Sequence, residues 1–134
     1  MSSSYVRGLA RTWASAAATA TSIPFYETVN TDQNPSDPVW WTIEFSAEFS
    51  EKLSFCDTWR EEGIADIVVS GRPGVGDLAV IDASEKIRDN MLSNNDPARK
   101  FYLAGPNPPV EYSGGSGELS WYQVSISIEY SYIN

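Results

Sequence analysis

One glycine-rich stretch of the sequence could in principle bind a phosphate group. Residues 71–77 read Gly-Arg-Pro-Gly-Val-Gly-Asp and lie between a predicted strand and a predicted helix, where backbone amides can cradle an anion. The stretch lacks the Lys-Ser/Thr pair of a P-loop and does not fit the G-x-G-x-x-G pattern, and Asp77 would repel a phosphate. We therefore interpret it as a strand-to-helix turn in which Asp77 caps the helix.

Neighbouring carboxylates could act as an acid and a base, or bind a hard cation. Glu61, Glu62 and Asp66 are the candidates, but the sequence holds 18 acidic residues and charge runs usually face water. We expect Glu61 and Glu62 to form a solvated turn. Asp66 stands in an otherwise apolar stretch, so we expect it to pair with an arginine, either within the chain or across a subunit contact.

The chain has few of the residue types that nucleophilic catalysis requires. The sequence contains no histidine, which removes the commonest general base, a leading metal ligand and every Ser-His-Asp or Cys-His arrangement. Cys56 is the single cysteine, and its neighbour Asp57 does nothing to activate a thiol. We expect no enzymatic activity, no cofactor and no bound metal.

Tryptophans could form a stacking platform for sugars or single-stranded nucleic acid. Trp41 falls in the apolar register of its predicted strand, whereas Trp40 and Trp121 fall in polar registers. The nine Lys and Arg residues are scattered and the net charge is -9, so no basic track accompanies these rings. We favour protein contact over ligand stacking. A small carbohydrate- or nucleotide-binding module is the alternative from another class.

Periodic patterns predict the elements that position these side chains. Helical spacing of Val6, Leu9 and Trp13 predicts a helix over residues 4–20, and a second helix is expected to follow Asp77 and to end near residues 94–97. Strict alternation of apolar and polar residues predicts the strongest strands. The expected strands are residues 23–29, 41–50, 64–70, 100–104 (resuming at 110–112) and 122–132. Residues 51–60 are expected to form a long hairpin connection, with the option that its arms continue as strand.

This order, α-β-β-β-α-β-β, predicts a single α+β domain over residues 1–134. The sheet should be mostly antiparallel, with two helices packed on one face, because the alternating strands each have one polar side. No apolar run approaches the roughly 20 residues of a membrane span. No secretory signal is visible, and the single cysteine suits a reducing cytoplasm.

Several local signatures, in this order, resemble the tail-terminator and tail-completion proteins of long-tailed phages, including the lambda-like terminator. The resemblance spans nearly the whole chain and is one of pattern. After the N-terminal helix it rests on residues 23–29 (Ile-Pro-Phe-Tyr-Glu-Thr-Val), 38–43 (Pro-Val-Trp-Trp-Thr-Ile), 59–64 (Trp-Arg-Glu-Glu-Gly-Ile), 73–76 (Pro-Gly-Val-Gly) and 121–124 (Trp-Tyr-Gln-Val).

The resemblance implies a structural virion protein that forms a six-membered ring on the tail tube of a siphovirus-like particle. The ring would stop tube polymerisation and join the tail to the head, in virions assembled in the host cytoplasm. Its partners would be further copies of the chain, the tail tube protein and head–tail connector proteins, with DNA only as cargo passing through the lumen. A head–tail connector or a minor tail or neck protein of the same fold is the alternative.

The resemblance carries over no catalytic residue. It does imply that the connection between the second and third predicted strands, about residues 50–63, faces neighbouring subunits or the lumen of the ring. The two tryptophans in polar registers would add protein contacts. The expected subunit-interface residues are Glu51, Lys52, Asp57, Arg60, Glu61, Glu62, Trp40 and Trp121.

Overall fold

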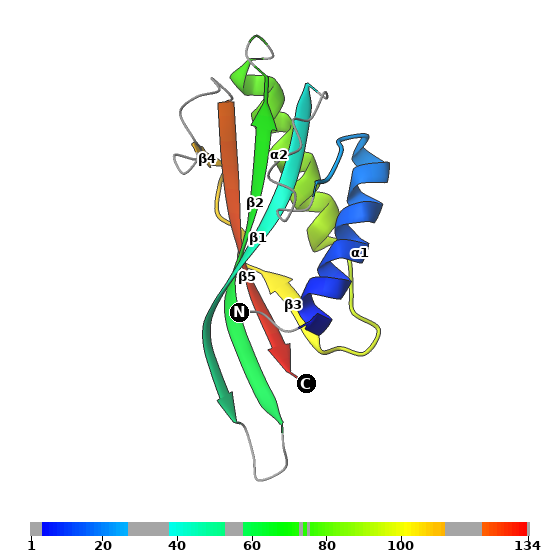
Figure 1. Cartoon of the computed structure of the whole chain (residues 1–134), viewed down its shortest axis with the longest axis vertical. Helices are drawn as coiled ribbons and strands as arrows, with labels where there is room; N and C mark the ends of the chain where they lie inside the picture. The colour runs from blue at the N-terminus through cyan, green and yellow to red at the C-terminus, as the bar shows by residue number, and fades with distance from the viewer. Residues whose placement is uncertain are drawn as a thin grey trace.

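A computed structural model describes residues 4–26, 38–52, 58–72, 74, 76–111 and 122–133. The elements are α1 (Ser4–Thr21), β1 (Val39–Lys52), β2 (Trp59–Gly71), α2 (Asp77–Leu92), β3 (Phe101–Ala104), β4 (Val110–Glu111) and β5 (Tyr122–Ile133). The strands form one antiparallel sheet in the order β1-β2-β5-β3, and β4 pairs with another stretch of β5 (Figure 1). The predicted α+β class with a mostly antiparallel sheet is confirmed.

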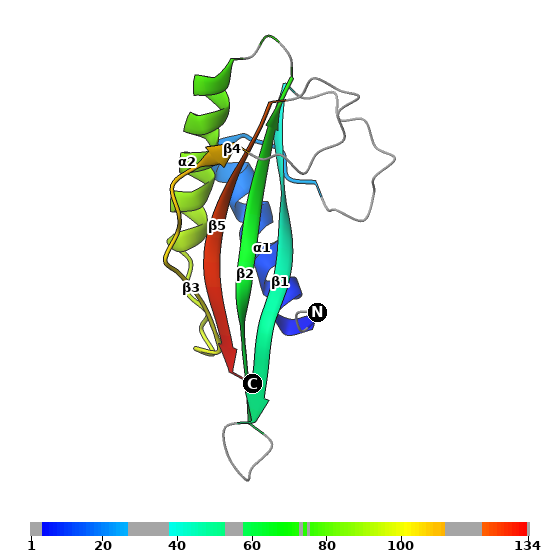
Figure 2. The same ribbon diagram turned by 90° about the vertical axis from the view of Figure 1, so that its left-hand side faces the viewer.

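Both helices pack against the same face of the sheet (Figure 2). Alternate residues of β1, β2 and β5 point toward the helices, and every third or fourth residue of each helix packs against them. Together these side chains form the core between the helices and the sheet. Burying each large apolar side chain there stabilises the fold by roughly 1.5–3 kcal/mol. The core residues with no exposed surface are Val6, Ala14, Ala17, Trp41, Val69, Val80, Ile87 and Ile126.

The first helix matches its prediction closely and packs through small residues. Ala14 and Ala17 bring its backbone near the core, and the Trp13 ring stacks on Phe101 with centroids 5.1 Å apart. The helix ends at Thr21, one residue beyond its predicted end. The next residue, Ser22, has a φ of 60°. No helix in the described part of the chain is long and apolar enough to cross a membrane.

The strand predicted over residues 23–29 is wrong for its described part. Phe25 forms one isolated parallel bridge with Trp41; the Tyr26 amide donates to Trp41 O at 2.9 Å, and the Trp41 amide donates to Pro24 O at 3.1 Å. Proline has no amide hydrogen to donate, so it does not extend a ladder. Residues 27–29 lie outside the described part.

The segment after α2 holds two short strands in place of one. Gly105, with a φ of +62°, and the prolines that follow it separate β3 from β4, since proline interrupts strand pairing. Across the gap the Asn107 amide donates to Ser127 O at 3.0 Å. The order of elements is therefore α-β-β-α-β-β-β, whereas the sequence predicted α-β-β-β-α-β-β.

The arms of the predicted 51–60 connection continue as strand on both sides, which the sequence had left open, and the hairpin of β1 and β2 is irregular. Pairing runs from Val39 opposite Gly71 to Lys52 opposite Trp59. The predicted unbroken alternation along β1 stops at a β-bulge between Ala47 and Phe49, which shifts the register. A bulge bends its strand and increases the local twist, and the hairpin extends past the end of β5 in Figure 1.

The start of α2 differs from the predicted cap. Gly76, with a φ of +92°, occupies the N-cap position and supplies no side-chain hydrogen bond, while Asp77 is the first helical residue. The Asp77 carboxylate accepts a hydrogen bond of 2.8 Å from the Leu78 amide. It still places negative charge at the positive end of the helix, where that charge is favourable.

Candidate functional site

The charged residues predicted for a subunit interface lie on the hairpin, where three of them bond to one another. The Arg60 guanidinium is 2.7 Å from a Glu51 oxygen on the opposite strand and 3.4 Å from a Glu62 oxygen. Half-exposed ion pairs of this kind contribute about 0.2–1 kcal/mol each. Lys52 pairs in register with Trp59 at the hairpin end, and Asp57 lies outside the described residues. The two ion pairs therefore join residues of the hairpin of one chain.

Glu61 has a structural partner within the fold. The Tyr130 hydroxyl donates a hydrogen bond of 3.0 Å to Glu61, and Tyr130 is buried in the helix-covered layer. Burial, and then the bond to Glu61, raise the pKa of the Tyr130 phenol above its ordinary value of 10.0. The side chain of Glu61 on β2 is therefore hydrogen-bonded to Tyr130 on β5.

The three candidate carboxylates do not point toward one another. Glu61 and Glu62 are adjacent strand residues and so point to opposite faces of β2. Asp66 accepts a hydrogen bond from the Ser127 hydroxyl, and no ion pair to Asp66 occurs among the described residues. An arginine partner within the described part of the chain is therefore wrong, and a partner across a subunit contact stays a prediction. No group of three potential metal-ligating side chains occurs in the described part of the chain.

The sheet face opposite the helices, called here the open face, is polar and acidic. Glu44 and Asp66 are direct cross-strand neighbours on it, and Glu129 lies one row further along. Near the other end of the same face Ser70 and Ser125 are buried, and the Gln123 amide donates to the Ser70 hydroxyl at 2.9 Å. The face thus divides into a covered polar half and an exposed acidic half. It is defined by Trp40, Thr42, Glu44, Ile64, Asp66, Val68, Ser70, Gln123, Ser125, Ser127 and Glu129.

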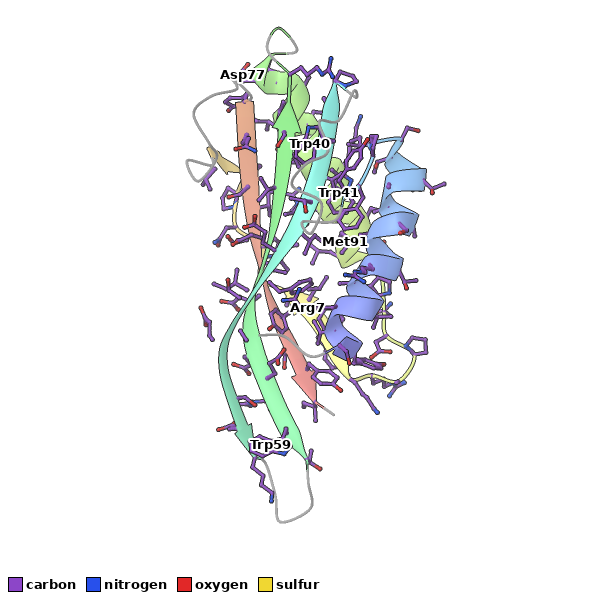
Figure 3. All side chains as sticks on the ribbon, viewed as in Figure 1. Arg7, Trp40, Trp41, Trp59, Asp77 and Met91 are labelled. Carbon is purple, nitrogen blue, oxygen red and sulfur yellow. The ribbon has the colours of Figure 1, made fainter. Side chains whose placement is uncertain are left out.

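The tryptophans fall into different environments. Trp41 is fully buried and its indole donates to Ile23 O at 3.0 Å, as its apolar register predicted. Trp40 takes the opposite register but is only partly exposed, and its ring packs edge-on against Tyr26 with centroids 5.7 Å apart. Trp121 lies outside the described residues. Among the described tryptophans, Trp59 is the exposed one, with 45% of its surface accessible, at the hairpin end in Figure 3.

The glycine-rich turn offers no further chemistry. Gly74 and Gly76 have φ values of +94° and +92°, which favour glycine, and the Leu78 amide donates to the Asp77 carboxylate. The turn therefore connects β2 to α2. Cys56 lies outside the described residues.

A pocket at the far edge of the sheet was not predicted from the sequence. It has a volume of about 510 Å³ and lies where α2 ends and β3 begins. Leu92, Phe101 and Leu103 supply apolar walls, and Arg99 and Tyr102 supply polar groups. The only sequence signal was alternation in residues 101–104, which leaves Tyr102 on the outer side with half of its surface exposed.

Asp96 organises the floor of this pocket. Its carboxylate accepts hydrogen bonds from the amides of Ala98, Lys100 and Phe101 at 3.0–3.1 Å and from the Tyr5 hydroxyl at 2.9 Å. Burial raises the pKa of Asp96, but these hydrogen bonds outweigh it and hold the pKa below its ordinary value. The 96–100 turn is thereby fixed against the start of α1.

No protein-family model matches this sequence, and no characterised protein matches it.

Proposed function

We propose that this protein is a structural subunit of a phage tail, which forms a ring at the end of the tail tube, stops its growth and provides the surface for head joining. The pattern resemblance over nearly the whole chain motivates the proposal, and the α+β fold is compatible with it. The proposal assigns no catalysis, in keeping with the missing histidine and the separated carboxylates.

The observation that carries the proposal is the pair of unlike sheet edges. β1 ends the sheet on one side, and beyond Trp41 no described residue pairs with its outer edge. The short strand β3 ends the sheet on the other side. Rings close through head-to-tail contacts in which two different patches meet, and two dissimilar edges on opposite sides of one subunit suit such contacts.

The charge of the chain supports a role around passing DNA. A net charge of -9 and the exposed acidic half of the open face disfavour adhesion to the phosphate backbone. A conduit that DNA must traverse benefits from this repulsion.

Disruption of the gene in the phage that encodes it tests the proposal. We expect separate filled heads and tails of abnormal length by electron microscopy, with normal virions restored by the wild-type gene supplied in trans. Tails of normal length that fail to join heads would instead favour a head–tail connector. Normal virions from the disrupted phage would contradict both assignments.

A further inference from the structure

The outer edge of β1 carries backbone groups that the subunit does not use. The Arg72 amide donates to Pro38 O, and in an antiparallel ladder every second residue along a strand bonds to the same partner strand. Ile43, Phe45 and Ala47 fall in the alternate set, so their N–H and C=O groups point away from β2. No described residue bonds to these groups. The edge is therefore open to one more strand.

The outer edge of β3 has the same property. The Ile133 amide donates to Lys100 O, which assigns the ladder bonds with β5 to Lys100 and to every second residue after it. Phe101 and Leu103 therefore direct their backbone groups outward. The Asp96 carboxylate accepts the outward amide of Phe101 at 3.1 Å. The Phe101 carbonyl and both backbone groups of Leu103 have no partner among the described residues.

The pocket described above keeps space open beside this edge. It is lined by Phe101 and Leu103 on β3 and by Leu92 and Asn94 at the end of α2, with a volume of about 510 Å³. The end of α2 therefore does not close over the backbone of Leu103.

The side-chain faces of the two edges agree. Ile43 and Phe45 on β1 belong to the helix-covered layer, as do Phe101 and Leu103 on β3. Residues directly opposite one another in a ladder place their side chains on the same face of the sheet, and a slip of one residue would reverse the faces. A pairing that uses the outward groups of both edges therefore also keeps the apolar faces of two sheets on one side.

The direction and position of the two edges suit copies related by rotation. All three pairings in the order β1-β2-β5-β3 are antiparallel, so β1 and β3 run in opposite directions. The register carries Leu103 through Tyr130 and Gly63 to Ala47 in one row across the sheet. Matching patches of a closed ring lie at similar heights along its axis. In a ring whose axis runs along the strands, both edges meet this condition and would pair antiparallel.

Strand length and charge also favour a second copy as the partner. The bulge after Ala47 ends the regular free stretch of β1, which leaves a short segment comparable to the four residues of β3. Arg99 and Lys100 come just before β3, and Glu48 comes just after Ala47. In an antiparallel pair the start of β3 lies beside this later part of β1, so opposite charges face each other.

We propose that residues 43–47 of β1 in one copy pair antiparallel with residues 101–103 of β3 in the next copy, so that the sheet continues from subunit to subunit. This inference rests on the proposed ring, and it adds the two strands that join it. The contact consists of backbone hydrogen bonds, with apolar side chains continuing on the helix-covered face.

Disulfide formation across the open face tests the pairing in assembled tails. Tyr102 is exposed at the β3 edge, and Glu44, Ser46 and Glu48 are exposed on β1. Full-length protein carrying Cys56→Ser, Tyr102→Cys and a cysteine at one of the three β1 positions is incorporated into tails and oxidised. Cross-strand neighbours have Cβ atoms close enough for a disulfide. We expect a ladder of covalent oligomers from at least one β1 position on a non-reducing denaturing gel.

The fold provides a control for this ladder. Within one subunit β1 and β3 are separated by β2 and β5, which places them roughly 14 Å apart, too far for a disulfide. The matched control replaces the β1 cysteine with Leu78→Cys, which is 77% exposed at the start of α2. It should remain monomeric on the gel.

A second measurement tests the backbone bonds themselves. Ala47→Pro removes an outward amide that has no partner within the subunit, so the variant should fold, as circular dichroism will show. It should weaken incorporation into tails by at least about fivefold in competition with wild type, the effect of one lost hydrogen bond. Ala47→Ser keeps the amide and should incorporate like wild type.

The outcomes distinguish this pairing from the proposed ring. Tails that contain the protein but give no ladder from any β1 position, an equal ladder in the Leu78→Cys control, or folded Ala47→Pro that incorporates like wild type would overturn the pairing and leave the ring intact. A band joining Tyr102→Cys to a different tail protein would overturn the pairing and assign the β3 edge to that protein. Absence of the chain from tails under every condition would overturn both.

Discussion

Asp96 is a buried carboxylate that determines the conformation of the 96–100 turn, which the sequence pattern did not predict. It is 7% exposed and receives hydrogen bonds from three backbone amides and one tyrosine hydroxyl. A carboxylate that accepts several such bonds is stabilised in its charged form. The turn after α2 and the N-terminal helix are therefore joined through one charge, although Tyr5 and Asp96 are 91 residues apart.

The stability of the fold should fall in acid through Asp96. Because the folded pKa is lower than the ordinary value of 3.8, its contribution is fully present above pH 3.8 and is lost as pH falls through the folded pKa. Asp96→Asn should lower the thermal midpoint at neutral pH and remove this part of the acid dependence. Thermal unfolding between pH 2 and pH 7 measures both.

Asp82→Asn is the matched control, since Asp82 forms only an exposed ion pair with Lys86 on α2. It should leave the acid dependence nearly as in wild type. If Asp96→Asn keeps the wild-type midpoint and acid profile, the hydrogen-bonded carboxylate does not organise the turn.

At the scale of elements, β1, β2 and β5 approach one another closely around Gly63. A Cβ atom built on Gly63 would lie 2.2 Å from Ser46 O and 2.8 Å from both the Ala47 Cα and the Tyr130 ring. Gly63 sits opposite Ala47, next to the bulge of β1. The close approach of backbone to backbone leaves no room for a side chain.

Gly63→Ala should therefore destabilise the protein by about 1–3 kcal/mol, the usual range for overpacking. Urea unfolding measures the change. The control is Gly8→Ala on the exposed side of α1, where an added Cβ meets nothing within 4 Å. It should stabilise the protein by about 0.5–1 kcal/mol, because alanine is the better helix former. Equal effects of the two variants would contradict the close packing at the bulge.

At the scale of the whole molecule, the two layers place the acidic half of the open face away from the helices. The basic side chains do not gather on one track. Arg7 lies over the Phe45 ring at 5.9 Å and Lys100 over the Tyr5 ring at 5.7 Å, while Arg60 is held within the hairpin. A surface with no basic track makes few phosphate contacts, so this charge distribution predicts weak binding to DNA.

We expect duplex DNA to bind with a Kd weaker than about 10⁻⁴ M at physiological salt. Fluorescence anisotropy of a labelled duplex measures this directly. Tighter binding that weakens steeply as salt is raised would indicate phosphate contacts and would argue against DNA as passing cargo.

Much of the fold followed from local periodicity. The helix from Ser4 and the alternating strand β5 were predicted to within one residue of their described bounds. The strand prediction was wrong for residues 23–26, the described part of the predicted 23–29 strand, because β-branched and aromatic composition does not reveal that Pro24 has no amide hydrogen to donate to a ladder. The bulge after Ala47 was invisible because Phe49 continues the apolar alternation in the sequence.

The candidate site was less predictable than the fold. The sequence located the charged hairpin, but it could not show that Arg60 bonds to Glu51 and Glu62 or that Glu61 meets Tyr130. Those pairings depend on the register between strands, and register is set by contacts between residues far apart in the chain.

Side-chain periodicity was enough to predict a two-layer α+β fold, because burial of one face of each helix and strand leaves a local trace in the sequence. Composition alone showed that the chain has no histidine. The exposure of Trp59, the partial burial of Trp40 and the pocket at Arg99 left no such trace. They arise only when the end of α2, the turn at Asp96 and the edge strand β3 come together, because a surface is formed by elements that neighbour one another in space and not in sequence.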